Sequence, residues 1–531
     1  MTRKKLLLLS LLSAVLLSLP WIGTSFSWTL FFALVPLLIV EDQLTTQHKS
    51  QGSIVLFSYA LLTFLLWNVL STWWIAYVSF GGMILISAIN SFLMACVWWL
   101  AHLVRRRFAI QTGYFSLIVF WLTFEFLHFH WAIQWPWLSL GNGFSNAVQL
   151  IQWYEFTGVL GGSLWVILIN VLLFNAFKCY SSKNTKTFLK LSATAFLLFA
   201  LPAGGSLVRY FTYAENGKTI EVVVLQPNID PYTEKFSSIS SQEQTRRLIS
   251  LAQPIVTDST RFVLAPETSL STIWEDENIR DNESLALIDS LIGKYPSIGF
   301  VAGAITQKKT GPGEPISYSA RQAGEGYFFN VFNSALLIDH SPRVQVAHKN
   351  ILVSGVEKMP FQKYFFHLGE YVVSIGGTAG SLSAGNQPSV FEGGRGEKIG
   401  SVICFESAFG GYVAGVVKKG ANVIFLLTND GWWKNSPGMR QHFAFARLRA
   451  VESRRSIVRS ANTGISGFIN ERGEIMKETP VDSCMAVISP VSLNKTLTFY
   501  VTWGDYLGQV SLLFSVLIFL YTLFDFARSR R

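Results

Sequence analysis

The chain has 531 residues, of which half are hydrophobic and only 14% are charged. Its mean hydropathy of +0.35 excludes an ordinary soluble protein of this length and predicts a membrane protein with a folded part outside the membrane. The net charge of +10 does not indicate a nucleic-acid partner, because the basic residues lie beside apolar runs and not together on one polar domain.

Eight apolar runs are long enough to cross a bilayer as helices. They lie at 5–22, 25–41, 53–72, 80–103, 114–130, 158–177, 187–204 and 506–525. The first run lacks a clear small-residue cleavage site and leads straight into the next one. We therefore expect it to be retained as a helix rather than removed as a signal peptide.

Basic residues mark alternate loops, as in TRKK at the start, RRR at 105–107 and RSRR at the end, whereas the loop 131–157 has no Lys or Arg. By the positive-inside rule, this pattern predicts that both termini are cytoplasmic. We expect three parts: a membrane domain at 1–204, an external domain at 205–505 and a last span with a tail at 506–531. In a bacterial inner (plasma) membrane the external domain would be periplasmic.

The external segment changes character, because glycine, proline and charged residues appear and the apolar runs shorten to strand length. Strands are predicted at 220–228, 261–268, 298–306, 330–339, 399–407 and 422–430. Helical patterns lie between several of them, at about 240–258, 282–294 and 437–455. Alternating strands and helices predict an α/β domain with a largely buried sheet.

The cysteines are few and scattered, at Cys96, Cys179, Cys404 and Cys484. No CxxC pair and no His/Cys cluster is present in the sequence, so neither a zinc site nor a disulfide framework is predicted. One Cys404–Cys484 bridge stays open as an alternative. We expect no metal and no cofactor.

Residues with useful chemistry lie at three strand ends. Glu267 follows VLAP, Lys349 follows VQVAH and Cys404 follows SVI. A carboxylate can take a thiol proton, an ammonium can stabilise a thiolate or an oxyanion, and a thiolate can attack a carbonyl. Each residue alone also has an ordinary interpretation, as a cap, a solvated strand end or a small core residue.

Taken together, APET around Glu267, HKNILV around Lys349 and ICFES around Cys404 resemble the nitrilase, or carbon–nitrogen hydrolase, superfamily. That superfamily places a Glu–Lys–Cys triad, in this chain order, on an αββα sandwich. With the eight spans, the whole chain resembles the apolipoprotein N-acyltransferase family. The sequences QPNI, FNSALL, LTNDGWW and WPWLSLG fit that family. The loop LVSGVEKMPF departs from its usual LVPFGEYVP, yet Glu357 keeps its spacing of eight residues after Lys349.

The resemblance implies a ping-pong acyl transfer in which Glu267 is the base, Cys404 carries a thioester, and Lys349 and the N–H of Phe405 hold the oxyanion. Its implied partners are a phospholipid donor, expected to be phosphatidylethanolamine, and a diacylglyceryl apolipoprotein acceptor. We expect a monomer.

The resemblance also implies several supporting residues. Glu357 and Glu406 would position Lys349 and the nucleophile turn. Phe236 stands where the family has a Trp, and Trp432 is interpreted either as part of the acyl pocket or as core.

The apolar segment 354–384 is interpreted as a lid or as a surface packed on the membrane helices. Glu125, inside the fifth span, is either functional or paired with a nearby histidine.

Two other functions are kept as alternatives. The first is a membrane-anchored carbon–nitrogen hydrolase, an amidase that uses the same triad on a small substrate with water as acceptor. The second is a transporter or receptor with an external binding module. That alternative predicts ionisable residues along the spans, where Glu125 is the one clear acid.

Overall fold

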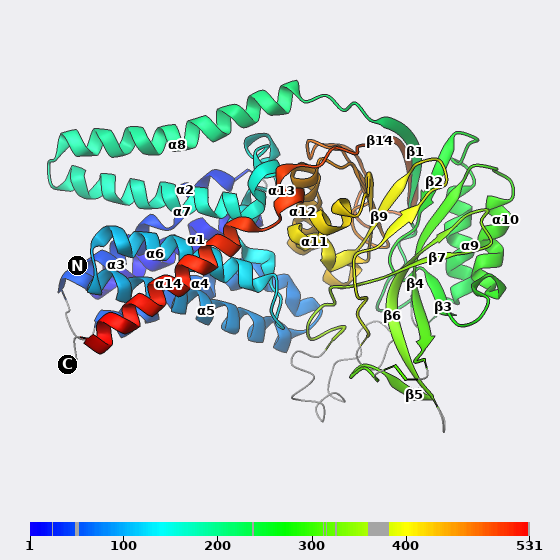
Figure 1. Cartoon of the computed structure of the whole chain (residues 1–531), viewed down its shortest axis with the longest axis horizontal. Coiled ribbons are helices and arrows are strands. Elements are labelled where there is room, and N and C mark those ends of the chain that lie inside the picture. Colours follow the sequence, from blue (N-terminus) through cyan, green and yellow to red (C-terminus); the bar gives the residue numbers. More distant parts are fainter. Residues whose placement is uncertain are drawn as a thin grey trace. The chain divides into compact units, whose positions relative to one another are not determined.

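The computed structural model describes residues 1–23, 25–47, 52–235, 238–311, 313–314, 316–323, 327–358 and 382–528. The chain divides into two compact units (Figure 1). One unit comprises Met1–Trp131, Trp135–Tyr213 and Trp503–Arg531, and the other comprises Ala132–Gln134 and Ala214–Thr502.

The first unit is helical and confirms the eight predicted apolar spans. Among the described residues, eight helical stretches are long and apolar enough to cross a membrane. They are formed by α1 (Arg3–Ile22), α2 (Leu30–Ala33) with α3 (Val35–Gln47), α4 (Gly52–Thr72), α5 (Phe80–Arg107), α6 (Ile110–His128), α7 (Tyr154–Ser181), α8 (Thr185–Thr212) and α14 (Tyr506–Arg528). Helix α8 continues past the predicted end at 204, and the first turn of α1 and the last turn of α14 lie at the same end of this unit (Figure 1).

Two acidic residues in α3 are paired with basic residues from two other helices. Arg105 Nη1 lies 2.8 Å from Glu41 Oε2, and Arg105 Nη2 lies 2.6 Å from Asp42 Oδ1. Lys178 Nζ lies 2.8 Å from Asp42 Oδ1 as well. Helices α3, α5 and α7 are thus joined at one level of the bundle by charges that compensate one another.

The buried carboxylate of Glu125 in α6 is fully engaged in holding other elements together. It accepts hydrogen bonds from Trp121 Nε1 at 2.9 Å, from the backbone N–H of Leu140 at 2.9 Å and from Ser163 Oγ at 2.5 Å. These donors come from α6, the following loop and α7. Glu125 is therefore a structural tie within this unit and does not pair with a neighbouring histidine.

The second unit contains two β-sheets. In the first sheet the strand order is β14-β1-β2-β4-β6-β5, with β3 beside β4 and β7 beside β6, and in the second it is β13-β12-β11-β10-β9-β8. The strands are β1 (Lys218–Gln226), β2 (Thr260–Leu264), β3 (Leu270–Trp274), β4 (Gly299–Lys309), β5 (Arg321–Ala323), β6 (Tyr327–Ile338), β7 (Gln345–His348), β8 (Val390–Glu392), β9 (Lys398–Ile403), β10 (Val423–Thr428), β11 (Ile457–Ala461), β12 (Gly467–Ile469), β13 (Ile475–Glu478) and β14 (Met485–Leu493). All six predicted strands are present.

Side-chain alternation along the strands builds four layers. On β1, Val222 and Val224 face the second sheet, whereas Val223 and Leu225 pack against α9 (Ser241–Ala252) and α10 (Glu283–Ile292). On β10, Phe425 faces the first sheet, and its neighbours on the strand pack against α11 (Gly410–Lys418) and α12 (Pro437–Ser453). The helices cover the outer faces of the two sheets (Figure 1), which confirms the αββα sandwich.

Strand direction brings several strand ends to the same edge of this sandwich. In the first sheet β2 runs parallel to β4, and β7 runs in the same direction because two antiparallel pairings separate it from β4. In the second sheet β9, β10 and β11 are parallel. The carboxyl ends of these strands are where layered α/β folds present their functional side chains.

Candidate active site

The three residues singled out in the sequence each follow the carboxyl end of a strand. Glu267 comes shortly after β2, Lys349 directly after β7 and Cys404 directly after β9. The structure brings Glu267 and Lys349 into contact, with Lys349 Nζ 3.1 Å from Glu267 Oε1. Lys349 is almost completely buried, so this pair is shielded from bulk water.

The position of Glu267 depends on a close approach between β4 and the segment that follows β2. Gly303 on β4 packs directly against the backbone of 266–268, and a Cβ on it would come within 2.6 Å of Glu267 Cα and 2.5 Å of Thr268 N. The N–H of Gly303 donates to the carbonyl of Pro266, and its carbonyl accepts from the N–H of Ser269. A larger residue at 303 would therefore displace the carboxylate.

A second carboxylate and an amide complete a closed polar cluster around the lysine. Lys349 Nζ also donates to Glu357 Oε1 at 2.8 Å. The amide Nδ2 of Asn333 donates to Glu267 Oε1 at 2.7 Å and to Glu357 Oε1 at 3.1 Å. Asn333 and Lys349 thus both donate to Oε1 of the Glu267 carboxylate.

The charges in this cluster set the state of the lysine and the thiol. Burial opposes the charge of Lys349, but the carboxylates of Glu267 and Glu357 outweigh it and hold the pKa of Lys349 well above its usual range. Burial raises the pKa of the Cys404 thiol; Glu267 adds to this effect and Lys349 counteracts it. Cys404 is therefore a neutral thiol at rest, and an attack by its sulfur requires a base to remove the proton.

A second buried lysine contacts the backbone of Glu267. Lys235 Nζ donates to the backbone carbonyl of Glu267 at 2.9 Å. Burial lowers the pKa of Lys235 to about 7, although the charge of Glu267 opposes that effect. The lysine thus holds the backbone of Glu267 in place.

Cys404 has a left-handed backbone conformation, with a φ of 50°. Such a conformation is uncommon for a residue with a Cβ and is found at functional turns between a strand and a helix. The cysteine is the first residue of a short 3-10 turn, Cys404–Ala408, that leads into α11. Cys404 therefore stands at the junction between β9 and the turn, where it packs against the core between the two sheets.

The carboxylate of Glu406 lies beneath this turn and joins it to the lysine loop. It accepts backbone hydrogen bonds from Ile403 at 2.8 Å, from Asn350 at 2.6 Å and from Ile351 at 3.2 Å. Burial raises the pKa of Glu406 to about 7, against the effect of these three donors. Glu406 therefore sets the relative position of the two loops that carry Lys349 and Cys404.

A buried imidazole supports the nucleophile turn from the other side. His442 Nε2 lies 3.1 Å from the carbonyl oxygen of Cys404 and 2.8 Å from Ser407 Oγ. His442 Nδ1 lies 2.9 Å from Asp430 Oδ1, and Arg459 Nη2 lies 2.6 Å from Asp430 Oδ2. Burial works against the charge of Asp430, but Arg459 and His442 lower its pKa to about 2.

The remaining predicted residues are placed less directly. Phe405 is buried and packs edge-to-face on Phe409. Trp432 is half-buried and meets the ring of Tyr232, whose hydroxyl donates to the Trp432 carbonyl at 2.7 Å. Phe236 lies outside the described residues, as does 359–381, which is most of the predicted lid.

Sequence reasoning overlooked several members of the site. Asn333 and Asp430 lay within the quoted sequences FNSALL and LTNDGWW, but neither was singled out. A polar Asn in the middle of an apolar strand and an Arg in the buried strand at 457–461 were signals that could have found Asn333 and Arg459.

All four cysteines are free thiols, so the open Cys404–Cys484 alternative is wrong. Within the described residues, no three His, Cys, Asp or Glu side chains are grouped so as to hold a metal ion.

Comparison with known proteins gives two matching family models. Residues 13–172 match the apolipoprotein N-acyltransferase N-terminal domain, and residues 216–495 match the carbon–nitrogen hydrolase family. The apolipoprotein N-acyltransferase of Chlorobaculum tepidum is 27% identical over 519 residues, which cover 95% of this chain and 94% of that protein. The apolipoprotein N-acyltransferase of Thermotoga maritima is 25% identical over 522 residues, covering 96% and 92%. Among solved structures, Saccharomyces cerevisiae Nit3, a member of branch 10 of the nitrilase superfamily, shares 16% identity with a TM-score of 0.38, covering 52% of this chain and 90% of that one.

Proposed function

The chain belongs to the apolipoprotein N-acyltransferases of the carbon–nitrogen hydrolase family, and from this membership we propose that it N-acylates the N-terminal diacylglyceryl-cysteine of bacterial lipoproteins. The acyl donor is a membrane phospholipid, with phosphatidylethanolamine as the expected headgroup. One observation carries the proposal: the same chain joins the matched N-terminal membrane domain to a buried Glu267–Lys349 pair and to a thiol that directly follows β9 of the other sheet.

The first half of the reaction forms a thioester. Glu267 Oε2 takes the thiol proton while Cys404 Sγ attacks the sn-1 ester carbonyl of the phospholipid, so that a C–S bond forms and a tetrahedral oxyanion develops. The ammonium of Lys349 and the N–H of Phe405 stabilise that oxyanion. The C–O bond then breaks, and Glu267 returns its proton to the departing lysophospholipid alkoxide.

The second half transfers the acyl group to nitrogen. The neutral α-amine of the diacylglyceryl-cysteine attacks the thioester carbonyl, and Glu267 takes a proton from the amine. The C–S bond breaks, an amide is left on the lipoprotein, and the sulfur of Cys404 recovers a proton from Glu267. A neutral resting thiol suits this cycle, because the base must be able to give back the proton it takes.

The supporting residues act through these three. Glu357 holds the ammonium of Lys349 in position, and Asn333 does the same for the carboxylate of Glu267. Glu406 positions the nucleophile turn. Trp432 and Phe236 are proposed to contact the acyl chain or the acceptor. The enzyme works as a monomer in the bacterial inner membrane, with 205–505 in the periplasm and both termini in the cytoplasm, as the distribution of basic residues favours.

A membrane-anchored amidase is the competing function, because it uses the same triad with water as acceptor. Mass spectrometry of the purified chain tests the choice between them. After incubation with phosphatidylethanolamine, wild type is expected to gain one fatty-acyl mass on Cys404, which a diacylglyceryl peptide then removes as an N-acyl peptide. Cys404→Ser should show neither event. Release of the acyl group as free fatty acid, with no acylated peptide, would establish the hydrolase instead.

A further inference from the structure

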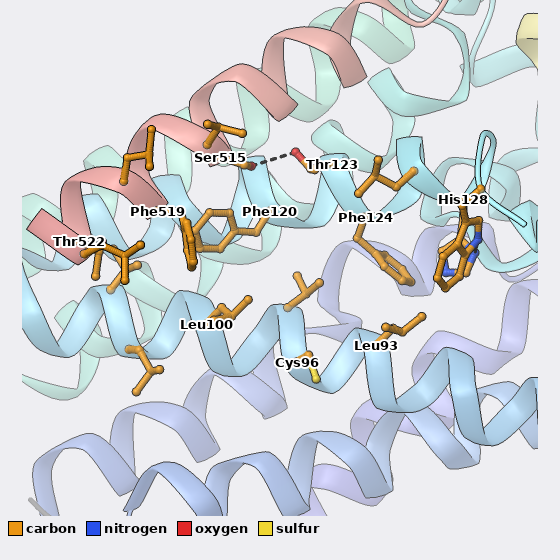
Figure 2. Close-up of a pocket in the computed structure, with 18 residues that line it drawn as sticks. Leu93, Cys96, Leu100, Phe120, Thr123, Phe124, His128, Ser515, Phe519 and Thr522 are labelled. Carbon is orange, nitrogen blue, oxygen red and sulfur yellow. Dashed lines mark hydrogen bonds between the residues drawn. The ribbon is translucent and has the colours of Figure 1, made fainter. Parts of the chain in front are cut away.

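A cavity of about 610 Å³ lies among three helices of the membrane unit, α5, α6 and α14 (Figure 2). Its size falls within the range of about 300–1,000 Å³ that is usual for sites of small ligands. The wall is built mainly from leucine, valine and phenylalanine side chains, among them Leu93, Leu100, Phe120 and Phe519. No step of the proposed reaction uses this cavity.

The hydroxyl groups in the wall are already satisfied by the protein. Thr123 Oγ1 of α6 and Ser515 Oγ of α14 lie 2.9 Å apart and hydrogen-bond to one another, as Figure 2 shows. Thr522 Oγ1 donates to the carbonyl of Ile518 in its own helix at 2.7 Å. A water molecule needs several polar partners of its own, so these walls suit an apolar occupant.

The cavity is elongated along the helices. On α5 its wall runs from Leu93 to Val104, which is about 16 Å at 1.5 Å per residue. That length is about half of a ~30 Å hydrocarbon core, which is the reach of a lipid chain from one leaflet. Helix α6 contacts both α5 and α14, so it forms the floor between two walls.

The two ends of the cavity differ in character. His128 and Thr522 lie toward opposite ends in Figure 2. At the His128 end, Trp131 Nε1 donates to His128 Nδ1 at 3.1 Å, and both side chains belong to the wall. Such amphipathic rings suit the level of a membrane where hydrocarbon gives way to ester and headgroup.

We propose that this cavity binds one hydrocarbon chain of a phospholipid from the surrounding bilayer, with the ester end beside Trp131 and the methyl end toward Thr522. The occupant is a bilayer lipid because the three wall helices are among those able to cross a membrane. In the membrane these helices are surrounded by phospholipid chains. A chain that moves from the bilayer into the cavity is not transferred out of water, so close packing determines whether it binds. The site binds a lipid without reacting with it.

A pair of tryptophan variants on one helix tests this assignment. Cys96→Trp places a large ring in the wall of the cavity. Leu85→Trp is the matched control, because Leu85 lies on the same helix α5, is 61% exposed and does not line the cavity. Full-length protein is reconstituted in vesicles of phosphatidylethanolamine and phosphatidylglycerol that contain a trace of phospholipid with a photoreactive acyl chain. Transfer into detergent dilutes loosely held lipid before irradiation, and labelled peptides are mapped by mass spectrometry.

In wild type and Leu85→Trp, label should concentrate on 93–104, 120–131 and 515–523. In Cys96→Trp it should fall about tenfold, the effect of an overpacking cost of about 1.4 kcal/mol. Label spread over other spans such as α8, or equal label in both variants, would overturn the proposal. If a photoreactive diacylglyceryl peptide labels these segments and the phospholipid does not, the occupant is the acceptor's chain, and the proposal is equally wrong. Should Cys96→Trp fail to accumulate, Leu100→Phe makes the same test with a smaller increase in volume. The readout is independent of acyl transfer, so it stands whether or not the proposed function holds.

Discussion

The Nε2 nitrogen of His442 lies 3.1 Å from the carbonyl oxygen of Cys404, and its Nδ1 nitrogen lies 2.9 Å from a carboxylate oxygen of Asp430. Ser407 Oγ also lies 2.8 Å from Nε2, and Arg459 Nη2 lies 3.1 Å from Nδ1, so the imidazole meets four polar groups. The imidazole thus ties the backbone of the nucleophile to a charged pair buried beneath it. We regard His442 as a positioning residue rather than a catalytic one, because it reaches the backbone of Cys404 and not the sulfur.

Replacing this imidazole should misplace the thiol. We expect His442→Leu to slow alkylation of Cys404 by a small thiol reagent by about 10²-fold, which is the usual cost of a displacement of about 1 Å in a reactive group. His442→Gln should retain more reactivity, because its amide can still donate to the Cys404 carbonyl. Peptide mapping distinguishes Cys404 from the other three cysteines. Arg440→Gln, an exposed change on the same helix, is the control, and equal labelling of all variants would show that His442 has no such role.

The buried carboxylate of Asp430 should make the folding stability of the protein fall at low pH. Its pKa is lowered to about 2 from an ordinary value of 3.8. A lowered carboxyl pKa contributes stability that is fully present above about pH 4 and is lost as the pH falls through 2. The shift corresponds to about 2 kcal/mol.

Thermal unfolding of wild type and Asp430→Asn between pH 2 and pH 7 measures this contribution. The variant should be less stable at neutral pH, by about 3–5 kcal/mol, because Arg459 loses its buried partner. The difference between the two proteins should narrow as the pH approaches 2. A difference that stays constant across this range would contradict the assignment.

Lys349 should act on the thiol through its charge. Lys349→Ala removes the one effect named above that lowers the pKa of Cys404 toward its ordinary value, so alkylation at neutral pH should slow and its pH profile should move to higher pH. Acyl transfer should fall by about 10²–10³-fold with the loss of an oxyanion donor. Lys349→Arg should rescue little, because a planar guanidinium does not fit where a compact ammonium bridges two carboxylates.

The control for this experiment is Lys398→Ala, because Lys398 forms an ion pair that is largely exposed. If Lys349→Ala is labelled as fast as wild type and forms the acyl-enzyme at a similar rate, Lys349 has no part in the mechanism.

The contact between Gly303 and Glu267 predicts a loss of activity without any change of a charged group. Gly303→Ala should push the backbone of 266–268 away from β4, at a cost of about 1–3 kcal/mol in the free energy of unfolding. Acyl transfer should decrease further than stability alone explains, because the carboxylate moves away from the thiol. Gly415→Ala in α11 serves for comparison, because its Cβ would meet one atom at an ordinary distance of 3.7 Å. Equal activity of both variants would show that Glu267 tolerates the shift.

Membrane topology can be tested with reporter fusions. A reporter that is active only in the cytoplasm should give no signal when it is inserted after Gly311, and it should give a signal when it follows Arg531. The reason is that an odd number of spans precedes the first site and a further span precedes the second. A cytoplasmic signal from the fusion at Gly311 would disprove the periplasmic location of the catalytic unit.

The sequence predicted several of the strands that are buried on both sides, although it did not predict the equally buried β11. Strands such as β4 and β10 read as continuous apolar runs because each lies between a layer of helices and another sheet. The short strand β5 and the partly exposed β13 were not predicted. Strands at such positions need few apolar residues, so their pairing leaves little trace in the sequence.

The sequence predicted site residues only where an ionisable or nucleophilic side chain also lies in a family motif. Glu267, Lys349 and Cys404 each stand at the end of a recognisable strand. His442 and Arg459 were overlooked because their roles depend on the docking of α12 and on the pairing of β10 with β11. The partners lie 12 and 29 positions from Asp430 along the chain, and no local pattern specifies that meeting.

Glu406 has a consequence for inhibition. Its carboxylate is the junction through which the loop after β7 and the turn after β9 hold each other in place. A compound that binds between these loops and breaks the hydrogen bond from Asn350 to Glu406 would displace Cys404 without reacting with its sulfur. Inhibitors of such an enzyme therefore do not need thiol-reactive groups, and a rigid noncovalent ligand would avoid the off-target chemistry that electrophiles bring.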